Sequence, residues 1–129
     1  MTTLRAFTRA VSPAIADCEL SFIDREPINL ALAQQQHMAY VDALIEAGVD
    51  VIALPALPDL PDSVFVEDTV LLFDELAVLT RPGASSRRAE VQAIASAVHH
   101  ARNTVAEIKA PGTLDGGDVM RSGSRAYVG

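Results

Sequence analysis

Several features that mark special classes of protein are scarce or missing in this sequence of 129 residues. It has one cysteine and no tryptophan, and aromatic residues make up 5% of it. A single cysteine excludes an internal disulfide framework, and no apolar run reaches the ~18 residues of a membrane-spanning helix. The N-terminus lacks the pattern of a secretory signal peptide, so we expect a cytoplasmic protein.

Positive charge is also scarce. The sequence has 10 Lys and Arg residues against 17 Asp and Glu residues, which gives a formal net charge of −7. Nucleic acids and anionic membranes attract basic stripes and patches, and the sequence has no such stripe. The charge balance therefore favours neither nucleic acid nor membrane as a partner.

What remains is a chain rich in aliphatic residues. Hydrophobic residues make up 50% of it, and its length suits one domain with a real core. Periodicity and turn residues predict an α/β protein. In the first half we expect a strand over 4–11, a loop over 16–22, a helix from Pro27 to a left-handed cap at Gly48, and a strand over 49–57. In the second half we expect a hairpin of 61–72 with 76–80, a loop over 81–86 whose last serine caps a helix that runs to about Ala101, and strands over 105–109, after 118 and over 125–128. The apolar stripes expected for the two helices are Leu30, Ala33, His37, Tyr40, Val41 and Leu44, and Val91, Ile94, Ala95 and Val98.

Residues 61–72 carry three carboxylates, Asp62, Glu67 and Asp68, in an otherwise apolar run. Interpreted as a strand, this stretch points Glu67 and Asp68 to opposite faces. One acid must then face inward or lie at the strand's end, and an unpaired buried carboxylate is costly. Two interpretations stay open. The acids meet an internal Arg or backbone N–H groups, or they form a negative pocket that receives a cation.

A second acidic motif, Asp115-Gly116-Gly117-Asp118, follows a Pro-Gly turn. Paired glycines allow close backbone approach or positive φ, which would bring both acids to the mouth of the sheet. The alternative is an ordinary turn, because Asp and Gly are common turn residues. No His is spaced to complete a metal site and no EF-hand pattern is present, so we expect no metal.

Arg87 and Arg88 lie at the expected start of the second helix, where a cation opposes the helix dipole. An anionic partner would explain them. The alternative is local pairing with Glu90 or another acid, worth under ~1 kcal/mol if exposed. Cys18 has no evident base beside it and is interpreted as a partly buried thiol rather than a nucleophile.

Three segments taken together resemble dimethylarginine dimethylaminohydrolase, a family of the guanidine-modifying, amidinotransferase-like superfamily. They are residues 65–68, 81–91 and 113–119, in this order. The resemblance implies a pentein-type α/β propeller of five ββαβ units, of which this chain would form about the first half. We therefore expect residues 1–129 to be the N-terminal part of a single catalytic domain.

The resemblance also implies a reaction and a set of site residues. The family hydrolyses Nω-methylated arginine to citrulline and a methylamine through a covalent Cys–thiouronium intermediate, without a cofactor or a metal. The matching residues here are Asp62, Glu67, Asp68 and Arg87 for the substrate, Leu20 in a mobile lid loop, and Asp115, which would orient the catalytic His. Asp68 would hold the guanidinium and Arg87 the substrate carboxylate.

The catalytic Cys, the catalytic His and a second substrate Arg of the family lie beyond the end of this sequence. We therefore expect these residues alone to be inactive and to self-associate through exposed sheet edges. Two other functions stay open, an arginine deiminase-like guanidino-hydrolase and an inactive module that binds arginine analogues.

Overall fold

The computed structural model describes residues 3–129 and divides the chain into two compact units, Met1–Val66 and Glu67–Gly129. Among the described residues, no helix is long and apolar enough to cross a membrane.

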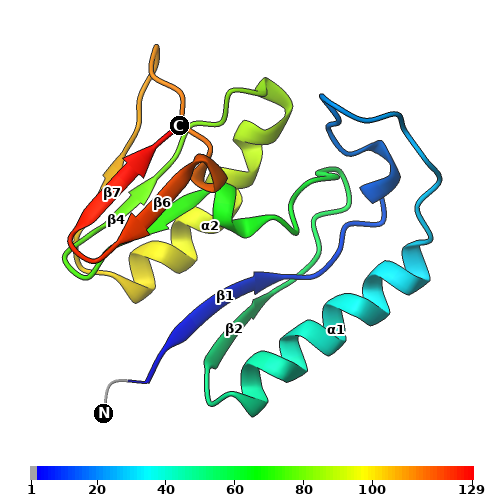
Figure 1. The fold of residues 1–129 in the computed structure, drawn as a ribbon, viewed down its shortest axis with the longest axis horizontal. Coiled ribbons are helices and arrows are strands. Elements are labelled where there is room, and N and C mark those ends of the chain that lie inside the picture. Colours follow the sequence, from blue (N-terminus) through cyan, green and yellow to red (C-terminus); the bar gives the residue numbers. More distant parts are fainter. Residues whose placement is uncertain (1–2) are drawn as a thin grey trace. The chain divides into compact units, whose positions relative to one another are not determined.

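The first unit is built around a parallel pair of strands with a helix between them in sequence (Figure 1). Strand β1 (Arg5–Arg9) pairs with β2 (Asp50–Leu54), so that Phe7 lies opposite Ile52. Parallel strands need a crossover connection. Helix α1 (Leu30–Glu46) provides it and packs against β2. Between β1 and α1 the chain makes one turn of 3-10 helix, Ile15–Asp17, and then a long loop.

Helix α1 begins later than its proline predicts. Asn29 is the N-cap, and its side-chain oxygen accepts a hydrogen bond from the backbone N–H of Leu32 at 3.0 Å. Pro27 therefore lies before the helix, whereas Gly48 has the expected left-handed φ of +83°. The predicted apolar stripe is half-buried except for Tyr40, which is 57% exposed. Burial also lowers the pKa of His37, which lies on this stripe.

The second unit contains a three-stranded sheet, a helix and a hairpin. Strand β3 (Val70–Leu72) pairs antiparallel with β4 (Ala77–Leu79), which confirms this part of the predicted hairpin, and β4 pairs parallel with β5 (Val105–Glu107). Helix α2 (Arg88–Ala101) connects β4 to β5 and packs on β4 with its predicted stripe, of which Val91, Ile94 and Val98 are buried. Strands β6 (Val119–Ser122) and β7 (Arg125–Val128) form a separate antiparallel hairpin.

The predicted strand over 61–72 is wrong for most of its length. The chain turns at 61–64, forms a 3-10 helix over Val66–Asp68, and becomes extended only in β3. Short-range hydrogen bonds explain this path, because the N–H of Ser63 donates to the carbonyl of Leu60 and the N–H of Phe65 to that of Asp62. Glu67 and Asp68 therefore do not alternate along a strand and need not point to opposite faces.

The start of α2 also differs from its prediction. A 3-10 helix, Ser85–Arg87, precedes it, and the N-cap position is Arg87 rather than a serine. This turn brings Arg87 to the junction of the two helical segments, where its side chain is buried.

Candidate functional site

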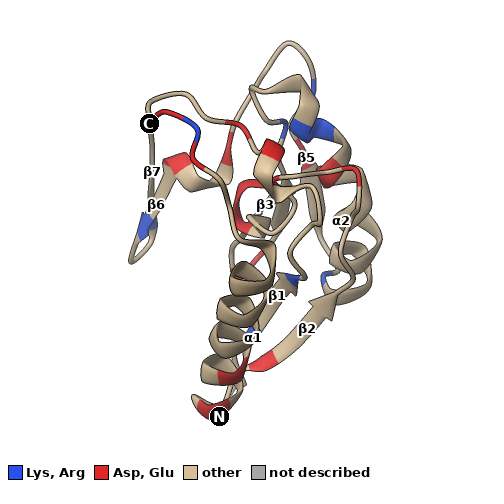
Figure 2. Cartoon of the chain, turned by 90° about the vertical axis from the view of Figure 1, so that its right-hand side faces the viewer, with Lys and Arg blue, Asp and Glu red and all other residues tan. Residues whose placement is uncertain are grey.

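The second unit contains a buried ion-pair network of three side chains. Arg87 donates from Nη1 to Oδ2 of Asp68 at 2.7 Å, from Nε to Oε1 of Glu90 at 3.1 Å, and from Nη2 to Oε2 of Glu90 at 2.8 Å. Its guanidinium therefore binds Glu90 through two parallel bonds and reaches Asp68 with the remaining nitrogen. Figure 2 shows basic and acidic residues close together at the start of α2.

Burial makes this network electrostatically strong. The exposed fractions of the side chains are 11% for Arg87, 18% for Asp68 and 3% for Glu90. Burial by itself lowers the pKa of Arg87, but its hydrogen bonds to Glu90 and then to Asp68 outweigh that effect and raise the pKa above its ordinary value. Arg87 is therefore a permanent cation, and local pairing with Glu90, one of the two interpretations of this residue, is present in the structure.

The glycine motif supplies the other partner of Asp68. The backbone N–H of Gly117 donates to Oδ1 of Asp68 at 2.9 Å. Any Cβ on Gly116 would lie 1.9 Å from the carbonyl oxygen of Glu67, and one on Gly117 would lie 2.7 Å from Oδ1 of Asp68. The predicted close backbone approach is thus confirmed, and it joins the motif over 115–118 to the acids at 67–68.

Asp115 and Glu67 lie beside this network. Asp115 is half-buried, and its Oδ2 accepts a hydrogen bond from the N–H of Gly83 at 3.1 Å. Glu67 is exposed in the 3-10 helix Val66–Asp68. The second unit therefore brings together four of the predicted site residues, while the roles assigned to them stay predictions.

Asp62 and Leu20 belong to the first unit. Asp62 is 6% exposed, and its two carboxylate oxygens accept hydrogen bonds from the N–H of Glu19 at 3.2 and 3.0 Å. A backbone N–H is one of the partners predicted for a buried acid in this stretch. Leu20 directly follows Glu19 in the sequence and is 37% exposed. Asp62 therefore fixes the backbone immediately before the predicted lid residue.

The loop that contains Leu20 folds back on itself. The guanidinium of Arg25 donates to the carbonyl oxygen of Ala16 and, at 2.6 Å, to that of Cys18. A cavity of about 630 Å³ is lined by Cys18, Leu20, Phe22, Ile23, Asp24, Glu26 and Ile28. The mobility predicted for this loop stays a prediction. Cys18 itself is buried, more fully than the partly buried thiol that was predicted.

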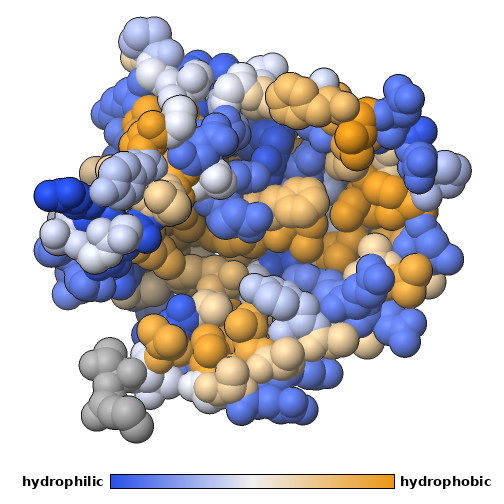
Figure 3. All heavy atoms as spheres, in the orientation of Figure 1, coloured by the Kyte–Doolittle hydropathy of each residue, from blue (hydrophilic) through white to orange (hydrophobic). Residues whose placement is uncertain are grey.

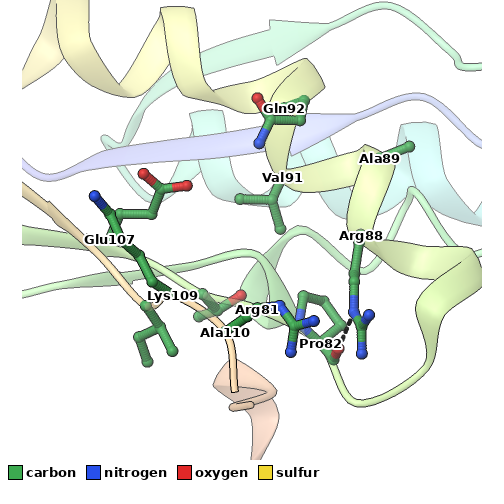
Figure 4. A pocket seen from close by; sticks show the side chains of 11 residues that line it. Arg81, Pro82, Arg88, Ala89, Val91, Gln92, Glu107, Lys109 and Ala110 are labelled. Atoms are coloured by element: carbon green, nitrogen blue, oxygen red, sulfur yellow. Dashed lines mark hydrogen bonds between the residues drawn. The ribbon is translucent and has the colours of Figure 1, made fainter. Parts of the chain in front are cut away.

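Arg88 differs from its neighbour Arg87. Figure 4 shows its guanidinium beside Pro82, and its Nε donates to the carbonyl oxygen of that residue at 3.0 Å. It lines a cavity of about 470 Å³ together with Arg81, Glu107 and Lys109, among others. Within residues 3–129 Arg88 forms no ion pair, so only Arg87 has the anionic partners that a cation at this helix start calls for.

Glu90 was not among the site residues predicted from the sequence. It was only the alternative local partner of Arg87, with the (i, i+3) spacing that is the signal for such a pair. That the same guanidinium also reaches Asp68, 19 residues earlier, required the folded backbone.

Comparison with known proteins gives a consistent family. The family model described as N,N dimethylarginine dimethylhydrolase, eukaryotic, matches residues 14–120, more than half of the chain. An N(G),N(G)-dimethylarginine dimethylaminohydrolase from Streptomyces coelicolor is 43% identical over all 129 residues, which cover 50% of its length. One from Pseudomonas aeruginosa is 46% identical over 102 residues, covering 78% of this chain and 40% of that protein.

Solved structures of the same family share the fold. A dimethylarginine dimethylaminohydrolase from Pseudomonas aeruginosa complexed with citrulline superimposes with a TM-score of 0.93 at 37% identity, covering 99% of this chain and 50% of that one. An arginine dihydrolase from cyanobacteria has a TM-score of 0.76 at 18% identity over 98% of this chain and 18% of its own, a likeness of fold alone.

The chain thus has about half of the pentein-type α/β fold of its structural neighbours. It likewise spans about half the length of the Streptomyces coelicolor relative, which it matches over all 129 residues. The chain belongs to the dimethylarginine dimethylaminohydrolase family.

Proposed function

We propose that this chain is the N-terminal half of a hydrolase that converts Nω-methylated arginine to citrulline and a methylamine. The observation that carries the proposal is the fixed carboxylate of Asp68. It is held by the N–H of Gly117 on one oxygen and by Arg87 on the other. A carboxylate that is held in one orientation and partly exposed suits a planar guanidinium, which binds carboxylates through directed hydrogen bonds.

The other site residues have defined parts in this proposal. Asp68 and Glu67 bind the guanidinium, and Arg87 holds the substrate carboxylate. Asp62 and Leu20, which belong to the first unit, are the other residues that we propose bind the substrate. Asp115 orients a His that lies outside these 129 residues.

The proposed chemistry is covalent. A Cys thiolate attacks the guanidinium carbon, the methylamine leaves with a proton from the His, and water then hydrolyses the thiouronium to citrulline while the thiolate is regenerated. Cys18 is not the nucleophile in this proposal, because it is buried and a nucleophilic thiolate requires a partially exposed, electropositive environment.

Exposed apolar surface supports a further part of the proposal, that these residues associate with each other or with the remainder of the protein. Figure 3 shows apolar side chains reaching the surface of the molecule. In the hairpin of the second unit, β7 is exposed along its whole length and includes Tyr127 and Val128, which are 48% and 63% exposed. An exposed strand of this kind is a ready pairing edge.

The amide of Gly117 provides a direct test of guanidino binding, because it donates to Asp68. We expect its ¹H–¹⁵N signal to shift and saturate as Nω,Nω-dimethylarginine is added to the chain. Norleucine has the same amino-acid end without a guanidinium and is the matched control. An equal response to the two compounds, or no response to either, would contradict the proposal.

A further inference from the structure

A cavity in the second unit concentrates positive charge in an otherwise acidic chain. It has a volume of about 470 Å³ and lies where the parallel strands β4 and β5 end and α2 begins. Arg81, Arg88 and Lys109 line it, three of the 10 Lys and Arg residues in a sequence with 17 Asp and Glu residues. Its described lining residues include none of those predicted to bind the guanidino substrate or to orient the His. The cavity is therefore separate from the site described above.

These three cations form no ion pair within residues 3–129, since the ion pairs of this part of the chain join other residues. One acid, Glu107, also lines the cavity, and it forms no ion pair within the same range. The lining therefore carries three positive charges against one negative charge. Such an excess attracts an anion, most strongly where the charges are shielded from water.

Backbone carbonyl groups hold two of these cations in place. Nη1 of Arg81 donates to the carbonyl oxygen of Gly112 at 3.1 Å. Arg88 donates from Nε to the carbonyl oxygen of Pro82 at 3.0 Å and from Nη2 to that of Gly83 at 3.3 Å. Both arginines are half-buried, and Figure 4 shows their guanidinium groups in the part of the cavity next to Pro82. A carbonyl oxygen satisfies a donor without neutralising the charge, and groups that are held in advance lose less entropy when a ligand binds.

We propose that this cavity is a binding site for a phosphate group. A phosphate monoester carries a charge of about −1.5 to −2 at neutral pH and presents three strong acceptor oxygens, which suits several cations better than a single carboxylate does. Arginine binds phosphate through parallel hydrogen bonds, and lysine binds it as a point charge. The volume of about 470 Å³ is that of a small-molecule pocket. The place is also favourable, because ligands of α/β proteins often bind outside the carboxyl ends of parallel strands.

Titration with glycerol 3-phosphate at constant ionic strength tests the site. We expect the ¹H–¹⁵N signals of Ala89 and Gln92, which line the cavity, to shift and saturate. Glycerol has no phosphate group and should shift neither signal. Inorganic phosphate distinguishes the two sources of the group, because tighter binding of the ester identifies a phosphorylated small molecule and equal binding identifies phosphate itself. No saturation with either phosphate compound, or equally tight binding of acetate, would overturn the proposal.

Charge-removing variants locate the binding in this cavity. We expect the dissociation constant of glycerol 3-phosphate to rise at least about tenfold in Arg88→Gln and about fivefold in Lys109→Gln. Arg125→Gln makes the same charge change at an exposed position of β7 and should alter it less than about twofold. The side chain of Lys109 is exposed and has no hydrogen bond or ion pair in the described chain, so Lys109→Gln decides the matter if Arg88→Gln does not fold in a circular dichroism melt. A folded Lys109→Gln variant with unchanged affinity would overturn the proposal, whatever the outcome for the guanidino site.

Discussion

Replacement of Asp68 by asparagine should weaken the binding of Nω,Nω-dimethylarginine to this chain at least ~tenfold, because a hydrogen bond to a charged group is worth ~1.5–3 kcal/mol. The substitution keeps the size of the side chain but removes the negative charge that would face the guanidinium in the proposed function. Isothermal titration calorimetry with the wild type and the variant measures the effect.

Asp74→Asn is the matched control for this substitution. Asp74 lies in the same unit and pairs with Arg121 at 3.1 Å, but its side chain is 84% exposed. We expect its loss to change binding by less than about twofold, as exposed ion pairs contribute little. Equal affinities of wild type and Asp68→Asn would give Asp68 a purely structural role.

Replacement of Gly116 by alanine should destabilise the second unit severely, by ~3 kcal/mol or more. The new Cβ would lie 1.9 Å from the carbonyl oxygen of Glu67, which is a backbone atom. Rotation of a side chain cannot relieve this contact, so the segment over 115–118 would have to move away from Asp68. The loss of unfolding free energy should lie at the upper end of the range for overpacked cores. Urea unfolding followed by circular dichroism measures the loss.

Gly83→Ala is the corresponding control. Its Cβ would meet the nearest atom, Oδ2 of Asp115, at 3.6 Å, which is ordinary van der Waals contact. We expect a change of unfolding free energy within about 1 kcal/mol, in either direction. If Gly116→Ala proved as stable as Gly83→Ala, the close approach between 116 and 67 would not exist in solution.

Much of the fold could be predicted because regular elements follow local rules. The parallel and antiparallel strands lie within the predicted segments, and the stripe of α2 at Val91, Ile94 and Val98 is buried as its period requires. The boundaries were less accurate where side chains compete for caps. Asn29 rather than Pro27 begins α1, because an amide oxygen can accept from a free N–H of the first turn.

Residues 61–72, the stretch with three carboxylates, were harder to predict from local sequence patterns. Its apolar residues predicted one long strand, but backbone hydrogen bonds from Ser63 and Phe65 turn the chain before β3 begins. The importance of its acids was nevertheless predictable, because buried carboxylates require partners wherever they lie. The partner of each acid was not predictable from the sequence. Asp62 accepts a hydrogen bond from the backbone N–H of Glu19, whereas Asp68 accepts hydrogen bonds from Arg87 and from the N–H of Gly117.

The central claim is that these 129 residues supply the substrate site of a dimethylarginine hydrolase whose nucleophile lies elsewhere. Joining them to the C-terminal half of the Streptomyces coelicolor relative, which is 43% identical over this whole chain, tests the claim most directly. The chimera should release citrulline from dimethylarginine, whereas residues 1–129 alone should release none, since loss of a covalent nucleophile removes several orders of magnitude in rate. A folded chimera that makes no citrulline, or turnover by residues 1–129 alone that disappears in Cys18→Ser, would contradict it.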